Sequence, residues 1–157
     1  MTLATITTYQ WYLAVHILAA VLWVGGAFTL QLFAIRTSRA RSAERMAGFA
    51  GDAEWVGTRV FVPASLALVV FGFLLIHQQH YEYKFWLVFP IVVWAASFVT
   101  GAAFLGPQSG RLSKAIEARG IESPEATAIQ QRIFLVSRVE LAFLLLVVLD
   151  MVLKPFA

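Results

Sequence analysis

The sequence predicts an all-α integral membrane protein: a four-helix bundle with both chain ends outside the membrane and short interfacial helices in its cytoplasmic loops. Two observations predict it, the grouping of the apolar residues and the uneven placement of positive charge. Of the 157 residues, 60% are hydrophobic and only 13% are charged, and the mean hydropathy is +0.76. A chain this apolar is not expected to fold as an ordinary water-soluble domain.

The apolar residues form four runs long enough to cross a bilayer. A spanning helix needs about 20 mostly apolar residues, and such runs occur at about 9–35, 58–79, 85–106 and 133–154. The connections between them are too short for a separate soluble domain, so we expect residues 1–157 to form one transmembrane domain. The first run is too long for a signal peptide and ends in arginines, so we expect it to be retained.

Positive charge lies on one side of this predicted bundle. Ten of the 12 Lys and Arg residues fall in or beside the first and third connections: Arg36, Arg39, Arg41, Arg45, Arg59, Arg111, Lys114, Arg119, Arg132 and Arg138. Cytoplasmic loops carry the excess of positive charge. We therefore expect an inner-membrane protein with its N-terminus, second connection and C-terminus outside. The basic loops are interpreted as topology signals, and no nucleic-acid partner is expected.

The two long connections are predicted to carry surface helices. Residues 42–50 fit a short interfacial helix, broken by Gly48 and Gly51, after which Asp52 would cap the second span. After the third span, Gly106-Pro107 would end the membrane helix, and an amphipathic helix would run to Gly120.

Three prolines punctuate the predicted helices. Ser123-Pro124-Glu125 is typical of a helix start, with a capping hydroxyl, a proline in the first turn and an acid at the positive end of the dipole. Pro63 and Pro90 lie inside the second and third spans, where each removes an amide donor. We expect both helices to bend there, as a packing feature or as a functional opening.

Ionisable side chains inside the membrane are the candidate functional residues, because each costs on the order of 3 kcal/mol there. His16 lies about seven residues inside the first span, roughly 10 Å deep at 1.5 Å per residue. His77 and His80 close the second span on the same outer side. The chain has no cysteine, so a metal would need His, Met or carboxylate ligands.

The fourth span presents a polar stripe. At 100° per residue, Glu140, Asp150, Met151 and Lys154 share one side of the helix. Asp150 and Met151 reach about the depth of His16, so Asp150 would orient the imidazole for a metal. Alternatively, Met151 would be the second axial ligand of a haem.

Each candidate also has a structural interpretation. His16 could bridge helices through a hydrogen bond, and His77 and His80 could simply be hydrated at the interface. Asp150 and Lys154 could form a local ion pair. Glu140 is predicted to form a structural ion pair with Arg59. The run Trp23-Val24-Gly25-Gly26 would allow another backbone to approach closely, and would also make room for a flat macrocycle.

Two segments resemble known membrane proteins. The first span, His16-Ile17 with Trp23-Val24-Gly25-Gly26-Ala27-Phe28, resembles the opening helix of the HemJ family of protoporphyrinogen oxidases. The end, Arg138 with Glu140 and then Leu153-Lys154-Pro155-Phe156, resembles its closing helix. By topology, most of the chain is similar to uncharacterised bacterial four-helix membrane proteins related to HemJ and to the CopD copper-resistance proteins, with the specific motifs confined to the two terminal helices. The HemJ resemblance implies that His16 ligates haem b and that the chemistry is porphyrinogen oxidation, with electrons leaving through a membrane partner.

The leading hypothesis is therefore a haem b-binding redox protein, a HemJ-like oxidoreductase if it is an enzyme. His16 would be the axial ligand, His77 or Met151 the second ligand, and Asp150 the residue that orients the imidazole. Tyr12, Trp23 and Trp94 would line the ring. Two alternatives remain: a non-catalytic accessory subunit of a membrane complex, and a CopD-like copper or small-ion protein with metal at His16, His77 and His80. The bilayer is the expected surrounding, and a homo-oligomer fits so small a bundle.

Overall fold

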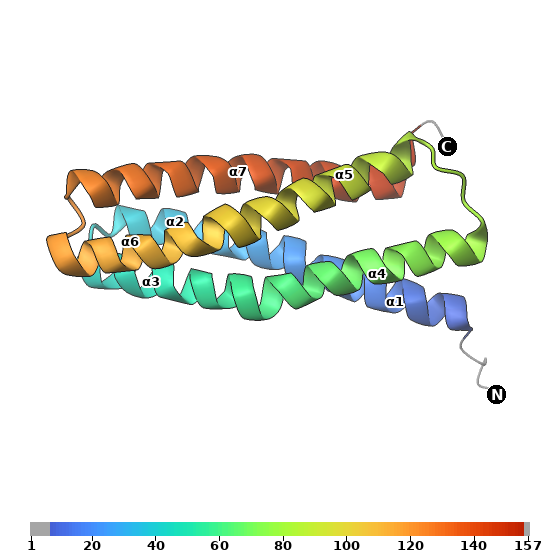
Figure 1. Ribbon diagram of the computed structural model, residues 1–157, viewed down its shortest axis with the longest axis horizontal. Helices are drawn as coiled ribbons and strands as arrows, with labels where there is room; N and C mark the ends of the chain where they lie inside the picture. The colour runs from blue at the N-terminus through green and yellow to red at the C-terminus, as the bar shows by residue number, and fades with distance from the viewer. Residues whose placement is uncertain (1–6, 156–157) are drawn as a thin grey trace.

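The computed structural model describes residues 7–155, and nearly all of them are helical. Four long helices lie side by side as an elongated bundle (Figure 1). The elements follow in the order α1 (Thr8–Ala20), η1 (Val21–Gly25), α2 (Gly26–Arg39), α3 (Ala43–Val56), η2 (Gly57–Phe61), α4 (Val62–Gln79), α5 (Phe85–Thr100), η3 (Gly101–Leu105), α6 (Gly106–Arg119) and α7 (Pro124–Leu153). The labels η1 to η3 mark single π-helical turns that join α-helices without a break.

Three of the four long helices are long and apolar enough to cross a membrane. They are Thr8–Arg39, Ala43–Gln79 and Phe85–Arg119. The fourth, α7, has 30 residues and carries Arg138, Glu140 and Asp150 in its apolar part. Large apolar side chains point outward on all four helices, as Leu18, Val70, Val99 and Leu149 do. Such a surface needs an apolar surrounding, which the lipid of a bilayer provides.

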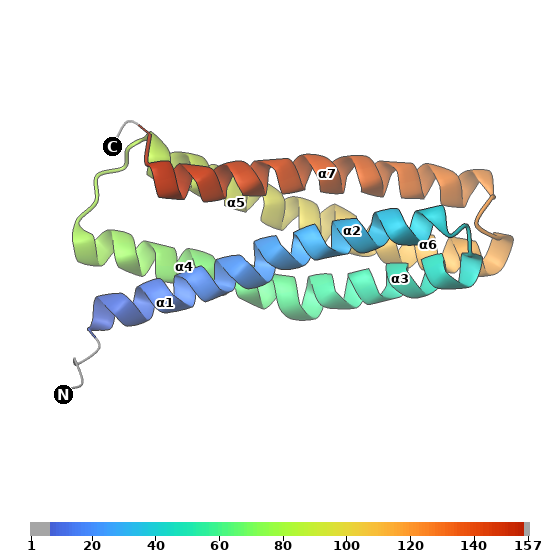
Figure 2. The same ribbon diagram turned by 180° about the vertical axis from the view of Figure 1, so that it is seen from behind.

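The two ends of the bundle differ. The described chain begins and finishes at one end, where the α4–α5 connection also lies, and we call this the terminal end (Figures 1 and 2). The α2–α3 and α6–α7 connections lie at the opposite end, the turn end. Arginines gather there, including Arg36 and Arg39 in the last turn of α2 and Arg119 in the last turn of α6.

The predicted short interfacial helices are not separate elements. Residues 43–56 form α3, which continues through η2 into α4, so Asp52 lies inside a helix and caps nothing. The cap is Ser42, whose hydroxyl accepts a hydrogen bond from the Arg45 amide at 3.3 Å. Gly48 and Gly51 do not break the helix, because packing against α6 outweighs the roughly 1 kcal/mol that each glycine costs. That packing is a buried core of Met46, Ala47, Ala50, Leu112, Ala115, Ile116 and Ala126.

Gly106-Pro107 does not end the third helix either. The helix continues from α5 through η3 into α6. It ends at its C-cap, Gly120, whose φ is 83°. Pro107 and Pro63 each follow a π-helical turn, where the helical hydrogen-bond pattern is already shifted and a missing amide is tolerated. Pro90 lies within α5. The predicted start of the last helix is confirmed: Ser123 caps α7 and accepts from the Ala126 amide.

Candidate functional site

A cavity of about 440 Å³ lies at the terminal end of the bundle. We call it the terminal cavity. Residues of α1, α4, α5 and α7 line it, and most of them are apolar or aromatic. They are Tyr9, Leu13, His16, Ile17, Leu68, Val69, Gly72, Phe73, Leu75, Ile76, Tyr81, Trp86, Leu87, Pro90, Ile91, Trp94, Met151, Val152 and Lys154. A volume of this size falls within the range of small-molecule and cofactor sites.

His16 reaches the terminal cavity from α1 and is fixed by the backbone of α4. Its Nδ1 lies 2.8 Å from the carbonyl oxygen of Leu68. A carbonyl can only accept, so Nδ1 carries the hydrogen and donates it. In the neutral ring Nε2 then keeps its lone pair, and no residue in the described part of the chain makes a hydrogen bond to it. The site therefore contains an imidazole whose tautomer is set and whose second nitrogen is available.

Gly72 makes the room for this ring. A Cβ at position 72 would lie 3.2 Å from His16 Cε1 and 3.4 Å from Nδ1. An approach of 3.2 Å is tighter than nine in ten Cβ contacts. The absence of a side chain one turn beyond Leu68 thus allows the imidazole to lie against α4.

Three further side chains frame the terminal cavity. Met151 lines it from α7. Trp94 lines it from α5 and donates its indole N–H to the carbonyl of Ser65 at 3.0 Å. Lys154, the left-handed cap of α7, holds its ammonium 5.6 Å from the Tyr81 ring and 5.0 Å from the Trp86 ring.

The other predicted ligands and lining residues lie elsewhere. Tyr12 packs edge-on against Phe71, with ring centroids 5.8 Å apart. His77 is exposed near His80, with ring centroids 6.3 Å apart. It lies five residues beyond Gly72, about 140° further round α4, so it does not face His16. Within residues 7–155, no three His, Asp or Glu side chains gather as a metal site would require.

Asp150 does not orient His16. Its side chain is buried, both carboxylate oxygens lack a hydrogen-bond partner in the described chain, and it is not among the residues that line the terminal cavity. The partner of the imidazole is instead the carbonyl of Leu68. On α7 it is Met151, and not Asp150, that lines the cavity with His16.

The predicted Arg59–Glu140 ion pair is not formed. Over residues 7–155 the single ion pair joins Arg119 and Glu125 at the turn end. Arg59 is exposed, whereas Glu140 lines a second cavity.

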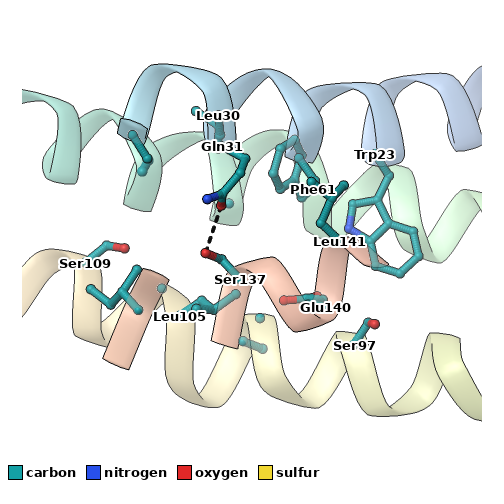
Figure 3. Close-up of a pocket in the computed structure, with 18 of the residues that line it drawn as sticks. Trp23, Leu30, Gln31, Phe61, Ser97, Leu105, Ser109, Ser137, Glu140 and Leu141 are labelled. Carbon is teal, nitrogen blue, oxygen red and sulfur yellow. Dashed lines mark hydrogen bonds between the residues drawn. The ribbon is translucent and has the colours of Figure 1, made fainter. Parts of the chain in front are cut away.

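This second cavity, the central cavity, has a volume of about 150 Å³ and lies toward the turn end. Figure 3 shows Gln31, Ser97, Ser109, Ser137 and Glu140 around it. The Ser137 hydroxyl donates to Oε1 of Gln31 at 3.0 Å. Trp23, a predicted ring-lining residue, faces this cavity and not the one that holds His16.

An apolar layer separates the two cavities. It consists of the buried residues Trp23, Ala64, Val93 and Leu144 with side chains packed around them, including Phe61, Leu68 and Trp94. The sequence predicts Glu140 as an intramembrane carboxyl group but does not predict the central cavity that it lines. The available signal was the set of serines in otherwise apolar helices, at positions 65, 97 and 137.

Of the pair Gly25-Gly26, only Gly26 makes a close approach. A Cβ at Gly26 would lie 2.6 Å from Cε1 of Phe61, whereas one at Gly25 would have nothing within 4 Å. The close neighbour of Gly26 is therefore an aromatic side chain of η2 rather than another backbone.

Comparison with known families places the chain in a family of membrane proteins. A family model described as a predicted integral membrane protein, DUF2269, matches residues 11–155. No curated protein and no solved structure matches the chain.

Proposed function

Because the chain belongs to the DUF2269 family of predicted integral membrane proteins, we propose a role inside the bilayer: it binds haem b in the terminal cavity and acts as a membrane redox protein. His16 is the proposed axial ligand. The observation that carries the proposal is the hydrogen bond from His16 Nδ1 to the Leu68 carbonyl, which leaves Nε2 available beside a cavity. Metal-ligating histidines are typically held by such a bond through their other ring nitrogen.

The side chains that line the terminal cavity have the apolar character that a haem site requires. Its volume of about 440 Å³ is bounded mainly by aliphatic and aromatic side chains, as a porphyrin face requires. Trp94 is held in a fixed orientation by its bond to Ser65. Lys154 supplies a cation at the boundary of the cavity, where an acidic edge of a ligand would be stabilised.

Met151 is favoured over His77 as the second ligand. Met151 and His16 line the same cavity from helices α7 and α1, on different sides of the bundle. His77 is exposed and not among the lining residues. A histidine and a methionine together form an axial pair of the kind found in electron-transfer cytochromes.

The chain's own residues would position and insulate the cofactor. Leu68 holds the imidazole and increases its basicity, Gly72 allows the ring to lie close to α4, and the apolar walls exclude water. A bound haem supplies one-electron transfer. Reaction partners proposed for this site are a porphyrin substrate, as in HemJ-type oxidases, or a membrane electron-transfer protein.

The proposed orientation follows from charge. Arginines gather at the turn end, so this end would be cytoplasmic, and α7 would be the fourth span. The N- and C-termini would then lie outside an inner bacterial membrane, and His16 would lie in the outer half of the bilayer. Phe156, the last residue of the HemJ-like closing segment, lies outside the described residues.

A haem titration tests the proposal. Purified protein in mild detergent is titrated with haem, and the Soret band is followed in the wild type, His16→Ala and His77→Ala. We expect saturable one-to-one binding that is lost in His16→Ala and retained in His77→Ala. Equal binding by His16→Ala would contradict the assignment. Copper added in place of haem tests the CopD-like alternative, which predicts dependence on His77 and His80. Absence of any ligand together with a co-purifying partner would favour the accessory subunit.

A further inference from the structure

The central cavity is bordered by all three π-helical turns of the described chain. Trp23 comes from η1, Gly57 and Phe61 from η2, and Gly101 and Leu105 from η3. Single π-helical turns occur frequently at functional sites. Three consecutive long helices are thus distorted where they surround one small space.

Gln31 carries an unused donor in this space. The side chain is 9% exposed, and its Nε2 has no hydrogen-bond partner among residues 7–155. Its Oε1 accepts from Ser137 at 3.0 Å, which fixes the amide across the cavity (Figure 3). Burying an amide N–H₂ without an acceptor is unfavourable, so a bound group is expected to supply the acceptor.

Glu140 is the one titratable side chain among the residues that line the central cavity. No salt bridge or hydrogen bond to its carboxyl group is formed within the described chain. Among the described residues, the charged side chains on the helices packed around the central cavity make no ion pair with Glu140. Glu54 of α3 lies against Gly110, Arg59 of η2 is exposed, and Arg138 of α7 is exposed beside the Phe134 ring. A carboxyl group in this position needs a proton or a ligand to compensate its charge.

The polar groups of the cavity suit water better than a larger ligand. Gln31 offers a donor, Glu140 offers acceptors, and the hydroxyls of Ser97 and Ser109 can do either. Water both donates and accepts. At about 30 Å³ per molecule, a cavity of 150 Å³ holds about five waters.

We propose that the central cavity is a hydrated proton-binding site, in which Glu140 takes up the proton and Gln31, oriented by Ser137, holds the water that delivers it. The cavity extends toward the turn end, where Ser109 and Ala50 line it. The layer around Trp23 and Leu144 separates it from the terminal cavity. Protons therefore exchange with the turn side of the membrane. This site is independent of haem binding.

Infrared spectroscopy of the purified protein in lipid tests the site. The carboxylic-acid C=O band is recorded between mildly acidic and mildly alkaline pH, in H₂O and in D₂O. We expect a band that titrates reversibly and shifts promptly in D₂O. Glu140→Gln should remove it, while Asp150→Asn, which changes the other carboxyl group in the apolar part of α7, should leave it. Gln31→Leu should slow the D₂O shift, because the cavity loses a water ligand.

Several results would overturn the proposal. One such result is that no titrating carboxylic-acid band disappears in Glu140→Gln. Another is a band whose frequency does not change in D₂O. A midpoint that moves with added sodium, potassium or ammonium would assign the cavity to a cation instead. The measurement is repeated on His16→Ala, where the band should persist. Failure of haem binding and failure of the proton site are therefore observed separately.

Discussion

The Nδ1 atom of His16 lies 2.8 Å from the carbonyl oxygen of Leu68, so a side chain of the first long helix is fixed to the main chain of the second. The bond explains how an imidazole is accommodated among apolar helices, and it leaves the other ring nitrogen available. A helix-bridging role and a ligand role, which the sequence presents as alternatives, are thus compatible in one residue.

Filling the space at Gly72 should weaken haem binding. A Cβ there would lie 3.2 Å from His16 Cε1, so the ring must move, and a branched side chain must displace it further. Overpacking costs about 1–3 kcal/mol, which corresponds to a loss of affinity of roughly five- to 150-fold. We expect the haem dissociation constant to rise from Gly72 to Gly72→Ala to Gly72→Val. Gly48→Ala, where a Cβ meets nothing within 4 Å, is the control and should bind normally.

Replacing Met151 should alter the haem without removing it. Met151→Leu keeps most of the side-chain volume but lacks the thioether, so an axial methionine would be lost while His16 remains. Since axial methionine raises the reduction potential, we expect a lower potential and a changed reduced spectrum in a redox titration. Met46→Leu changes a methionine in the core near the turn end, which is 0% exposed, and should leave the potential unchanged. Identical potentials in Met151→Leu and the wild type would exclude this ligand.

The two adjacent glycines of the first helix should respond differently to alanine. Gly26→Ala would bring a Cβ to 2.6 Å from the Phe61 ring, whereas Gly25→Ala meets open space. We expect Gly26→Ala to destabilise the protein by about 1–3 kcal/mol through overpacking. Gly25→Ala should be neutral or slightly stabilising. Thermal unfolding in detergent compares them, and Phe61→Leu should partly rescue Gly26→Ala. Equal effects of the two alanines would contradict the packing described here.

Removing the Ser137 hydroxyl should release Gln31. Ser137→Ala deletes the donor to Gln31 Oε1, and an interhelical hydrogen bond of this kind contributes about 0.6–2 kcal/mol in a membrane protein. Unfolding measurements on Ser137→Ala, Gln31→Leu and the double variant give the coupling energy. We expect the double variant to cost less than the sum of the single changes. Strict additivity would mean that the two side chains do not interact.

Most of the fold can be predicted from the sequence. Long apolar runs require helices in any surrounding that lacks water, and the alternation of arginine-rich and arginine-poor connections indicates which helix ends lie together. The continuity of α3 with α4 and of α5 with α6 is harder to predict from the sequence. Gly48, Gly51 and Pro107 are local signals against a helix, and they are overridden by tertiary packing around Met46 and by a π-helical turn.

The candidate site is only partly predictable. Depth along a helix follows from counting residues, and His16 and Met151, which the sequence predicts at about one depth, line the same cavity. The direction of a side chain depends on how each helix is rotated and on π-helical turns that shift that rotation. Trp23 therefore faces the central cavity, and Asp150 is buried away from His16. A backbone carbonyl such as that of Leu68 carries no sequence signal at all.

The most direct test of the central claim is the absorption spectrum of the protein purified from haem-replete cells, oxidised and then reduced. We expect a Soret band with sharpened reduced bands in the wild type and their loss in His16→Ala, with the helical content of both proteins unchanged. A wild-type protein without a Soret band, or an unaltered band in His16→Ala, would contradict it.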